Sequence, residues 1–307
     1  LAAILLAMAP AMFLTTPPAI VLAAPATSSG DPRDAPHEKD RGGQHERGPR
    51  IATLDWTIAE TLIALDARLV GLAQIDGYTA WVGKPPVPDS VLDLGLRAQP
   101  NMEQLVGLGP DRIALSPMFA SLAPRLETVA PVTTFHLYGP DVETWPAIRR
   151  VTRELGAFAD RQAQAETLIS QTEARIDRLK ARLSKGAPPL IVVQFMDARH
   201  VRVFGENGLY HAVMNRLGLH NAWTGETNRW GFALVGLEAL AGLDGRLVVV
   251  RPYPVGVRRS LAESALWNRL IAQSRASVIE IDPVWSFGAL PSASRFAEQL
   301  VEALDDQ

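Results

Sequence analysis

Short apolar runs alternate with segments of helical periodicity through residues 50–141. Runs of this length are typical of buried strands, and they lie at 51–55, 68–74, 111–116 and 132–137. Helical periodicity at 101–108 and 122–129 predicts two of the helices between them. A third helix follows the first strand, where Thr57 and Glu60 have the spacing of a capping box. Repeated strand–helix–strand order implies parallel pairing, so we expect an N-terminal α/β lobe here.

The segment 142–186 shows helical periodicity without a strand signal. Leu155 and Gly156 predict a kink, and the residues after it alternate Glu with Arg and Lys until the pattern stops at Gly186. About 25 helical residues reach roughly 38 Å at 1.5 Å per residue, which exceeds the diameter of a small domain. We therefore expect a long interdomain helix in this segment.

Strand–helix alternation resumes in 187–307, which we expect to form a C-terminal α/β lobe. Apolar runs predict strands at 189–197, 200–205, 246–250 and 277–282, with the first two as a hairpin. Helical periodicity predicts helices at 209–218, 237–243, 261–272 and 292–304. The predicted fold class is therefore α/β, with two twisted-sheet lobes joined by one long rigid helix.

The N-terminal part of the chain is predicted to lie outside this fold. Residues 1–26 are mostly apolar, no charge occurs before Asp31, and the TTPP run at 15–18 argues against a membrane-spanning helix. We expect a signal peptide over 1–26 that lacks a basic n-region, and export to the periplasm by the general or the twin-arginine route. Residues 27–49 are polar and rich in Gly and Pro, which predicts a disordered linker.

Composition narrows the class of protein. The sequence contains no Cys, which excludes a disulfide framework, a thiolate nucleophile, a Cys-ligated metal and an acylated lipoprotein anchor. The 30 basic residues nearly balance 33 acidic ones, so the net charge of −3 gives no attraction to nucleic acid. We expect a soluble product without a lipid anchor, and take it to be a monomer.

Common catalytic motifs are missing from the sequence. It contains neither G-x-S-x-G nor H-E-x-x-H, and no G-x-G-x-x-G follows a predicted strand. Residues 77–84 approach a phosphate-binding loop, but the spacing is one residue too long and Pro85 replaces the required Ser or Thr. The histidines outside the linker show no metal-ligand spacing. We therefore expect no catalytic residue and no metal ligand, and favour a binding protein over an enzyme.

Several tryptophans lie where predicted strands end and loops begin. Ligands of open α/β sheets bind outside the carboxyl ends of the strands, so such residues are candidate walls of an apolar pocket. Each could instead cap the edge of a lobe's core, and Trp56, beside a helix start, has a structural interpretation. Arg97 precedes a predicted helix and is either a donor to ligand oxygens or a surface residue. The candidate pocket residues are Trp81, Trp223, Trp230 and Trp285.

Five strings, in this order, carry a resemblance to a known family. They are RIATLDW, WVGKPPVPDSVLDLGLRAQPNMEQL, DARHVRVFG, HNAWTGETNRWG and PVWSFGA. From about Arg50 to Leu304 the chain resembles the periplasmic ferric-hydroxamate (ferrichrome-type) siderophore-binding proteins of ABC iron importers. The resemblance implies a class III periplasmic binding protein fold, an Fe(III)-siderophore ligand without any intrinsic cofactor, and delivery to an inner-membrane ABC permease with its ATPase.

The resemblance also implies roles for particular residues. Arg97 matches an arginine that contacts hydroxamate oxygens, and the four loop tryptophans match pocket tryptophans. Three positions depart from the family: Phe119 and Phe287 replace tyrosines, and Leu115 replaces a tryptophan, so a more apolar site is expected and the exact siderophore stays open. Glu238 and Glu127 are the candidates for docking to the permease.

Two other functions remain open from the sequence. Related two-lobe proteins bind haem or cobalamin, so the ligand could be another iron chelate or a corrinoid. A siderophore-processing hydrolase is a more distant alternative, because the nucleophile and base it would need are missing.

Overall fold

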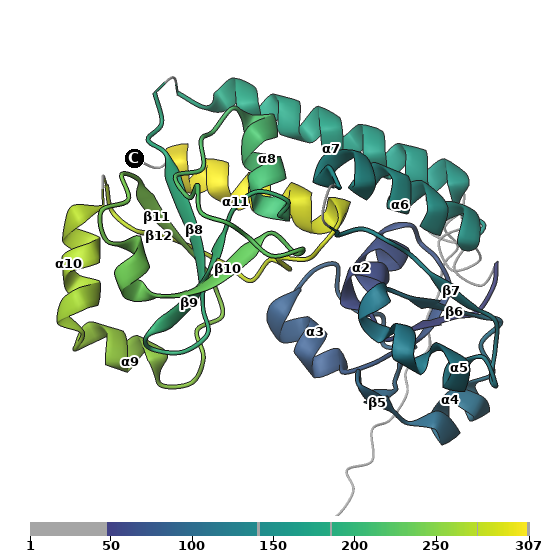
Figure 1. Ribbon diagram of the computed structural model, residues 1–307. Coiled ribbons are helices and arrows are strands. Elements are labelled where there is room, and N and C mark those ends of the chain that lie inside the picture. The colour runs from purple at the N-terminus through teal and green to yellow at the C-terminus, as the bar shows by residue number, and fades with distance from the viewer. Residues whose placement is uncertain (1–47, 140–141, 185, 275, 306–307) are drawn as a thin grey trace, which may run out of the picture. The chain divides into compact units, whose positions relative to one another are not determined.

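Two five-stranded sheets with flanking helices account for most of this computed structural model (Figure 1). The residues that the structure describes are 48–139, 142–184, 186–274 and 276–305. All of these residues belong to one unit, Asp40–Gln307. The signal peptide predicted at 1–26 and nearly all of the linker predicted at 27–49 lie outside the described residues. We call 50–141 the first lobe and 187–307 the second lobe.

The first lobe contains a sheet in the order β3-β2-β1-β6-β7, with every neighbouring pair parallel. Its strands are β1 (Ile51–Thr53), β2 (Leu69–Leu72), β3 (Leu92–Asp93), β6 (Arg112–Leu115) and β7 (Val132–Thr134). The four strands predicted for this lobe are all present, although each is shorter than its apolar run. An unpredicted antiparallel pair, β4 (Gly95–Leu96) and β5 (Gln99–Pro100), places Arg97 in the turn between them.

The first lobe's helices differ from the prediction in several ways: the helix predicted at 122–129 is shortened to 123–126, and the helices at 75–81 and 117–122 were not predicted. The helices of this lobe are α2 (Trp56–Ala64), α3 (Ile75–Trp81), α4 (Met102–Leu108) and α5 (Ala123–Leu126), with a 3₁₀ helix, η1 (Pro117–Leu122). The capping box at Thr57 and Glu60 was wrong, because Asp55 caps α2 by accepting hydrogen bonds from the amides of Thr57 and Ile58. Trp81 was expected in a loop, but it ends helix α3.

The segment 142–186 contains two helices instead of one continuous helix: α6 (Thr144–Phe158) and α7 (Gln162–Arg182). The chain turns back between them, with Asp160 at a positive φ of 56°. Arg153 pairs with Glu166, and Arg149 pairs with Glu173, so the helices run antiparallel. The kink expected at Gly156 was wrong, because Gly156 lies inside α6, where it faces Ala165 of α7, and the helix ends only after Phe158.

The second lobe contains a mixed sheet in the order β10-β9-β8-β11-β12. Strands β8, β11 and β12 are parallel, whereas β9 and β10 pair antiparallel, so the hairpin prediction is confirmed. Strand β10 had no clear sequence signal. The strands are β8 (Leu190–Phe195), β9 (His200–Phe204), β10 (Phe232–Gly236), β11 (Arg246–Val250) and β12 (Ile279–Ile281).

Two predicted helices of the second lobe are interrupted or shortened. Residues 237–243 form only a 3₁₀ helix, η2 (Leu237–Leu240). The helix predicted at 261–272 is divided because Ser264 caps a new helix by accepting a hydrogen bond from the amide of Trp267. The helices are α8 (Leu209–Leu217), α9 (Val257–Ala262), α10 (Ala265–Gln273) and α11 (Leu290–Asp305).

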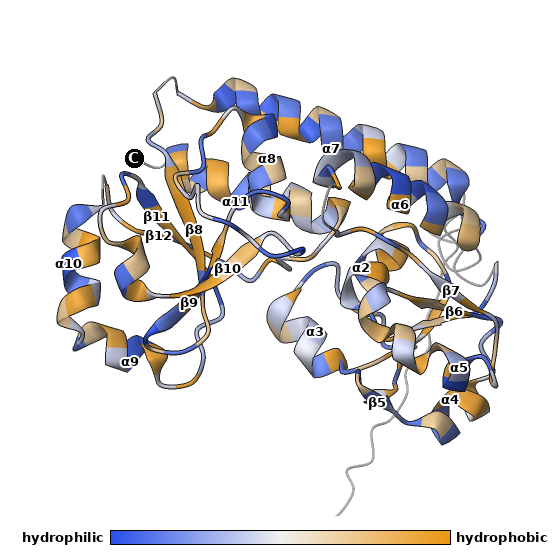
Figure 2. Cartoon of the chain, in the orientation of Figure 1, coloured by the Kyte–Doolittle hydropathy of each residue, from blue (hydrophilic) through white to orange (hydrophobic). Residues whose placement is uncertain are grey.

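The largest apolar core contains residues from both lobes and from the helices between them. Ile51 and Leu62 come from the first lobe, Ile176 from α7, and Val248 and Phe296 from the second lobe. Helix α11 contacts α2, α6, α7 and α8, and Figure 2 shows apolar strand β8 in contrast to the largely polar visible side of α7. Burial of apolar surface stabilises this arrangement by roughly 25 cal/mol per Å², so the two lobes are joined by packing as well as by the chain.

Within the described ranges, we find no helix with the length and apolar character that crossing a membrane requires.

Candidate functional site

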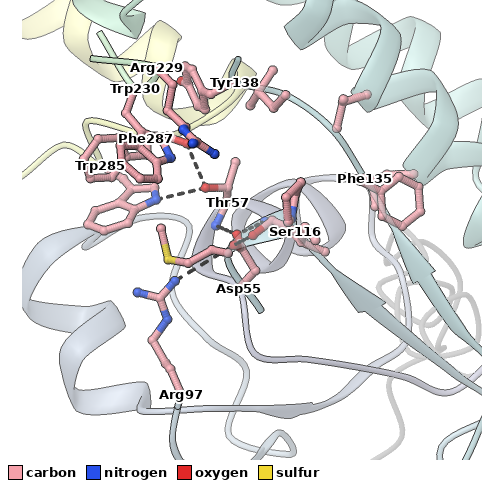
Figure 3. Close-up of a pocket in the computed structure, with 16 residues that line it drawn as sticks. Asp55, Thr57, Arg97, Ser116, Phe135, Tyr138, Arg229, Trp230, Trp285 and Phe287 are labelled. Carbon is pink, nitrogen blue, oxygen red and sulfur yellow. Dashed lines mark hydrogen bonds and ion pairs between the residues drawn. The ribbon is translucent and has the colours of Figure 1, made fainter. Parts of the chain in front are cut away.

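A pocket lies where the two lobes meet, and its lining comes from the ends of strands β1 and β6, the 135–138 segment, and loops of the second lobe (Figure 3). Ligand sites of α/β sheets occupy this edge because the loops that follow parallel strands converge there. The lining is mostly apolar, with a few polar side chains. The lining residues are Asp55, Thr57, Ile58, Arg97, Ser116, Pro117, Met118, Phe135, Leu137, Tyr138, Val151, Leu155, Arg229, Trp230, Trp285 and Phe287.

Arg97 is held in one orientation by a backbone hydrogen bond and two aromatic rings. Its Nε donates to the carbonyl of Leu54 at 3.0 Å. Its guanidinium carbon lies 4.2 Å from the ring centroid of Trp56 and 4.9 Å from that of Phe119. Burial lowers the pKa of Arg97, and the charge of Asp55 opposes that shift. Within the described chain the two Nη atoms have no hydrogen bond, so both remain available to a ligand oxygen.

Asp55 is the carboxylate nearest to Arg97, but most of its hydrogen-bonding capacity is already used. Its Oδ1 accepts from the amides of Thr57 and Ile58 at 2.8 and 3.2 Å, and its Oδ2 accepts from the hydroxyl of Ser116 at 2.6 Å. The Nη2 of Arg97 lies 3.9 Å from the same Oδ2. Asp55 therefore caps α2 and partly balances the charge of Arg97, while the Nη atoms of the arginine keep their hydrogen-bond donors for a ligand.

The second lobe supplies the aromatic wall of the pocket. Trp285 packs edge-to-face on Trp56 and on Phe287, with ring centroids 5.1 Å apart in each pair. Phe287 also contacts Tyr138 and Phe232, at 6.5 and 5.8 Å between centroids. These contacts fix the ring planes by packing. They give the pocket a preformed apolar wall.

Thr57, Glu60 and Tyr138 form hydrogen bonds to the segment that carries this wall. We call these three residues, which precede the second lobe in the chain, the interlobe clamp. The hydroxyl of Thr57 donates to the carbonyl of Phe287 at 2.8 Å and accepts from the indole of Trp285 at 3.0 Å. The hydroxyl of Tyr138 donates to the carbonyl of Gly288 at 2.7 Å. Glu60 accepts from the amide of Ala289 at 2.6 Å and from the hydroxyl of Ser292.

Glu60 is a fully buried carboxyl in this clamp. Burial raises the pKa of Glu60 to about 7, although the hydrogen bonds from Ser292 and Ala289 and the charge of Arg295 favour the ionised form. Burial likewise raises the pKa of Tyr138 well above its ordinary value. Glu60 therefore changes charge near neutral pH at the junction between the lobes.

Four of the residues expected to bind ligand line this pocket: Arg97, Trp230, Trp285 and Phe287. Phe119, which is 7 % exposed, lies behind them against the guanidinium of Arg97. The sequence thus predicted that the arginine and part of the aromatic wall lie in one pocket. Phe119 packs against the arginine from outside the lining.

Three expected residues lie away from the pocket lining. Leu115 is 0 % exposed, because its side chain packs into the core between the first sheet and α4 and η1. Trp81 packs on the shared core at the end of α3. Trp223 lies against the backbone of Gly205 and Gly225, and its buried indole nitrogen has no hydrogen-bond partner among the described residues.

Glu127 and Glu238, the docking candidates, are exposed on α5's C-terminal end and on η2.

Sequence reasoning missed five polar residues of the pocket: Asp55, Ser116, Thr57, Tyr138 and Arg229. A signal existed for the first two, because each is the last residue of a predicted strand and β1 and β6 are neighbours in the sheet. Arg229 directly precedes Trp230, which was itself a candidate. Tyr138 had the same signal, because it directly follows the strand predicted at 132–137 and β7 is the neighbour of β6. Its hydrogen-bond partner Gly288, 150 residues away, had no signal in the sequence.

No three His, Cys, Asp or Glu side chains of the described chain come together as metal ligands would.

Comparison with known proteins assigns the family. A model of the family described as periplasmic binding protein matches residues 51–284. The chain is 32 % identical over 257 residues to the iron(3+)-hydroxamate-binding protein FhuD of Escherichia coli (strain K12), covering 83 % of this chain and 86 % of that protein. The chain belongs to the periplasmic binding protein family.

Other relatives of this periplasmic binding protein also have names that refer to ferric siderophores. The ferric-anguibactin-binding protein FatB of Vibrio anguillarum is 26 % identical over 58 % of this chain and 55 % of FatB. The crystal structure of FhuD from Vibrio cholerae with Fe³⁺–Desferal matches with a TM-score of 0.79 and 26 % identity, covering 84 % of this chain and 98 % of that one. The two-lobed α/β fold class predicted from the sequence is thereby confirmed.

Proposed function

We propose that this periplasmic binding protein captures Fe(III)-hydroxamate siderophores in the periplasm and delivers them to an inner-membrane ABC permease. The observation that carries the proposal is the immobilised guanidinium of Arg97, which faces an apolar pocket walled by Trp230, Trp285 and Phe287. A guanidinium fork donates hydrogen bonds to anionic or metal-polarised oxygens. Hydroxamate oxygens on Fe(III) are acceptors of this kind.

The chemistry of the ligand explains why the site needs no metal ligands of its own. A hydroxamate siderophore surrounds Fe(III) with hard oxygen donors, which satisfy the metal's preference. The protein then has to bind only the outside of the complex, which is largely organic and apolar. An apolar wall with one oriented donor meets that requirement. Iron is therefore cargo here, and the protein acts as a carrier without a catalytic step.

Ligand titrations followed by tryptophan fluorescence test this function. Ferrichrome, a ferric catecholate complex, haem and cobalamin are added separately to the purified protein. We expect saturable quenching by the ferric hydroxamate at one equivalent, because Trp230 and Trp285 line the pocket. Quenching by cobalamin or haem alone would contradict the proposal. Recovery of chemically unchanged siderophore after incubation separates a carrier from a hydrolase.

Delivery requires that the permease recognise both lobes, for which Glu127 and Glu238 are the proposed contacts. Both side chains are exposed. Charge reversal at each, in a transport assay with intact cells, should reduce uptake without changing the dissociation constant of the ferric hydroxamate. Unchanged uptake by the double variant would contradict this assignment.

A further inference from the structure

Six arginines of the described chain stack on aromatic rings, and two of them differ from the rest. Four are paired with other groups as well: Arg97 with Asp55, Arg216 with Asp177, Arg258 with Glu280, and Arg112 with the carbonyl of Phe158. Arg202 and Arg229 have ring contacts alone, without a hydrogen bond or ion pair to any described residue. Both belong to the second lobe and lie at or beside the pocket.

Arg202 is partly buried on strand β9. Its guanidinium carbon lies 5.0 Å from the ring centroid of Phe232 and 5.6 Å from that of Phe287, which lines the pocket. Burial lowers the pKa of Arg202. Gln194 lies opposite Arg202 on the neighbouring strand β8. Its buried amide oxygen accepts no hydrogen bond, so it does not pair with the guanidinium. A partly desolvated guanidinium without an acceptor in the protein carries part of a desolvation cost, which a bound anion would offset.

Arg229 lines the pocket itself and is exposed, with its guanidinium carbon 5.3 Å from the ring centroid of Trp230 (Figure 3). Arg97 faces the same pocket from the first lobe. The only carboxylate in the described lining is Asp55, and its oxygens already cap α2 and accept from Ser116. The pocket therefore has an excess of positive charge, and the excess lies on the second lobe's side.

Resting on the proposed function, we infer that this protein selects ferric hydroxamates that carry free carboxylates. Arg229 would bind a carboxylate at the periphery of the complex, while Arg97 contacts the iron-bound oxygens. Arg202, beneath the ring of Phe287, adds a second positive charge to the same side. Guanidinium and carboxylate match as a bidentate pair, so the subsite recognises a feature of the siderophore that is remote from the metal.

Ferrichrome and ferrichrome A form a matched pair of probes, because they share an iron(III) trihydroxamate centre and only ferrichrome A carries free carboxylates. We expect the wild-type protein to bind ferrichrome A at least tenfold more tightly at low ionic strength, with the difference shrinking as salt rises. Arg229→Gln should weaken binding of ferrichrome A by about tenfold, the effect of one charge-assisted hydrogen bond. Arg202→Gln should weaken it several-fold, and in both variants the affinity for ferrichrome A should fall by a larger factor than the affinity for ferrichrome.

Arg258→Gln is the matched control, since Arg258 also stacks on a ring, Tyr253, but is paired with Glu280 and lies outside the pocket lining. It removes the same charge from the same lobe and should leave both affinities unchanged. Melting curves of all three variants identify any loss of folding. Equal binding of the two probes by wild type, or equal losses for both probes in Arg229→Gln, would overturn the carboxylate subsite and leave the proposed function intact. Failure of both probes to bind would overturn the proposed function and this inference together.

Discussion

Arg97 is ready to bind before any ligand arrives. Its Nε donates to the carbonyl of Leu54, and its planar group lies against the rings of Trp56 and Phe119. An arginine that is free in solution loses side-chain entropy when it binds. Here the fold has already restricted the side chain. The ring of Phe119 packs against this guanidinium and so helps to orient the donor.

Replacing Arg97 should weaken ferric hydroxamate binding without abolishing the pocket. A charge-assisted hydrogen bond contributes about 1.5–3 kcal/mol, so Arg97→Ala should raise the dissociation constant by roughly tenfold to a hundredfold. Arg97→Lys should recover only part of the affinity, because an ammonium group cannot reproduce the planar fork. Titration by fluorescence measures each constant. Arg97→Met keeps apolar contact with the two rings and separates loss of the donor from loss of packing. An unchanged constant for Arg97→Ala would rule out its role in the site.

Glu60 should make part of the protein's stability depend on pH. Its pKa in the folded protein is about 7, above the ordinary value of about 4.3 expected when unfolded. Between these values the folded state binds one more proton, so this group's contribution to the free energy of unfolding falls as pH rises from about 4.5 to 7. Below that window the contribution is fully present, and above it the contribution is lost.

Glu60→Gln removes this titration while keeping an acceptor for the amide of Ala289. Relative to wild type, the variant should gain stability as pH rises through the window, by up to about 1.4 kcal/mol per unit. Denaturant midpoints at pH 5, 6, 7 and 8 measure the difference. Glu166→Gln, at an exposed ion pair on α7, is the control. The hydrogen bond from Arg153 lowers the pKa of Glu166, so this carboxylate stays ionised over the tested range and its removal should show no such trend. A constant difference between wild type and Glu60→Gln would exclude the titration.

At the scale of elements, the sequence predicted what is buried better than what lies at an edge. Strands β1, β2, β8 and β11 have nearly every side chain buried, so their apolar runs were clear. Strands β3, β4 and β10 were obscure because they are short or exposed, with Leu96 and Leu234 59 % and 62 % exposed. Helix boundaries depended on single caps such as Asp55 and Ser264, which apolar periodicity does not register.

The site could be predicted where the type of residue alone indicates its role. It could not be predicted where the role depends on contacts between distant parts of the chain. An arginine and tryptophans in loops suggest a pocket, because one supplies hydrogen-bond donors and the others supply apolar surface. The hydrogen bonds of Thr57, Glu60 and Tyr138 join segments that are 150 or more residues apart. Leu115 shows the opposite limit, because a residue at a strand end points either toward the pocket or into the core, and only the packed sheet decides.

The contact between α6 and α7 depends on Gly156. An added Cβ would lie 2.6 Å from the Cβ of Ala165 and 3.1 Å from the carbonyl oxygen of Arg161. Gly156→Ala should therefore destabilise the protein by about 1–3 kcal/mol through overpacking. Gly107→Ala in α4 is the control: nothing lies within 4 Å of the added methyl, and better helix propensity should stabilise by up to about 1 kcal/mol. Thermal unfolding measures both, and a stabilised Gly156→Ala would contradict the close packing.

At the scale of the whole molecule, the shared core and the interlobe clamp both oppose movement of one lobe against the other. Opening the pocket widely would expose apolar residues of α2 and α11 and break the hydrogen bonds of Thr57, Glu60 and Tyr138. We therefore expect small changes on loading. X-ray scattering with and without ferrichrome should give the same radius of gyration within error, and a clear decrease would contradict this expectation.

The shared core has a consequence for how a transporter recognises its cargo. If the spacing between the two docking surfaces does not change when ligand binds, a permease cannot use that spacing to tell a loaded protein from an empty one. On the proposed function, a permease would then distinguish full from empty carriers by what fills the pocket, whose lining includes the exposed Met118 (51 %) and the exposed Arg229. In such a carrier the bound siderophore itself forms part of the surface that meets the permease. Its outer groups are therefore recognised once by the pocket and again by the permease.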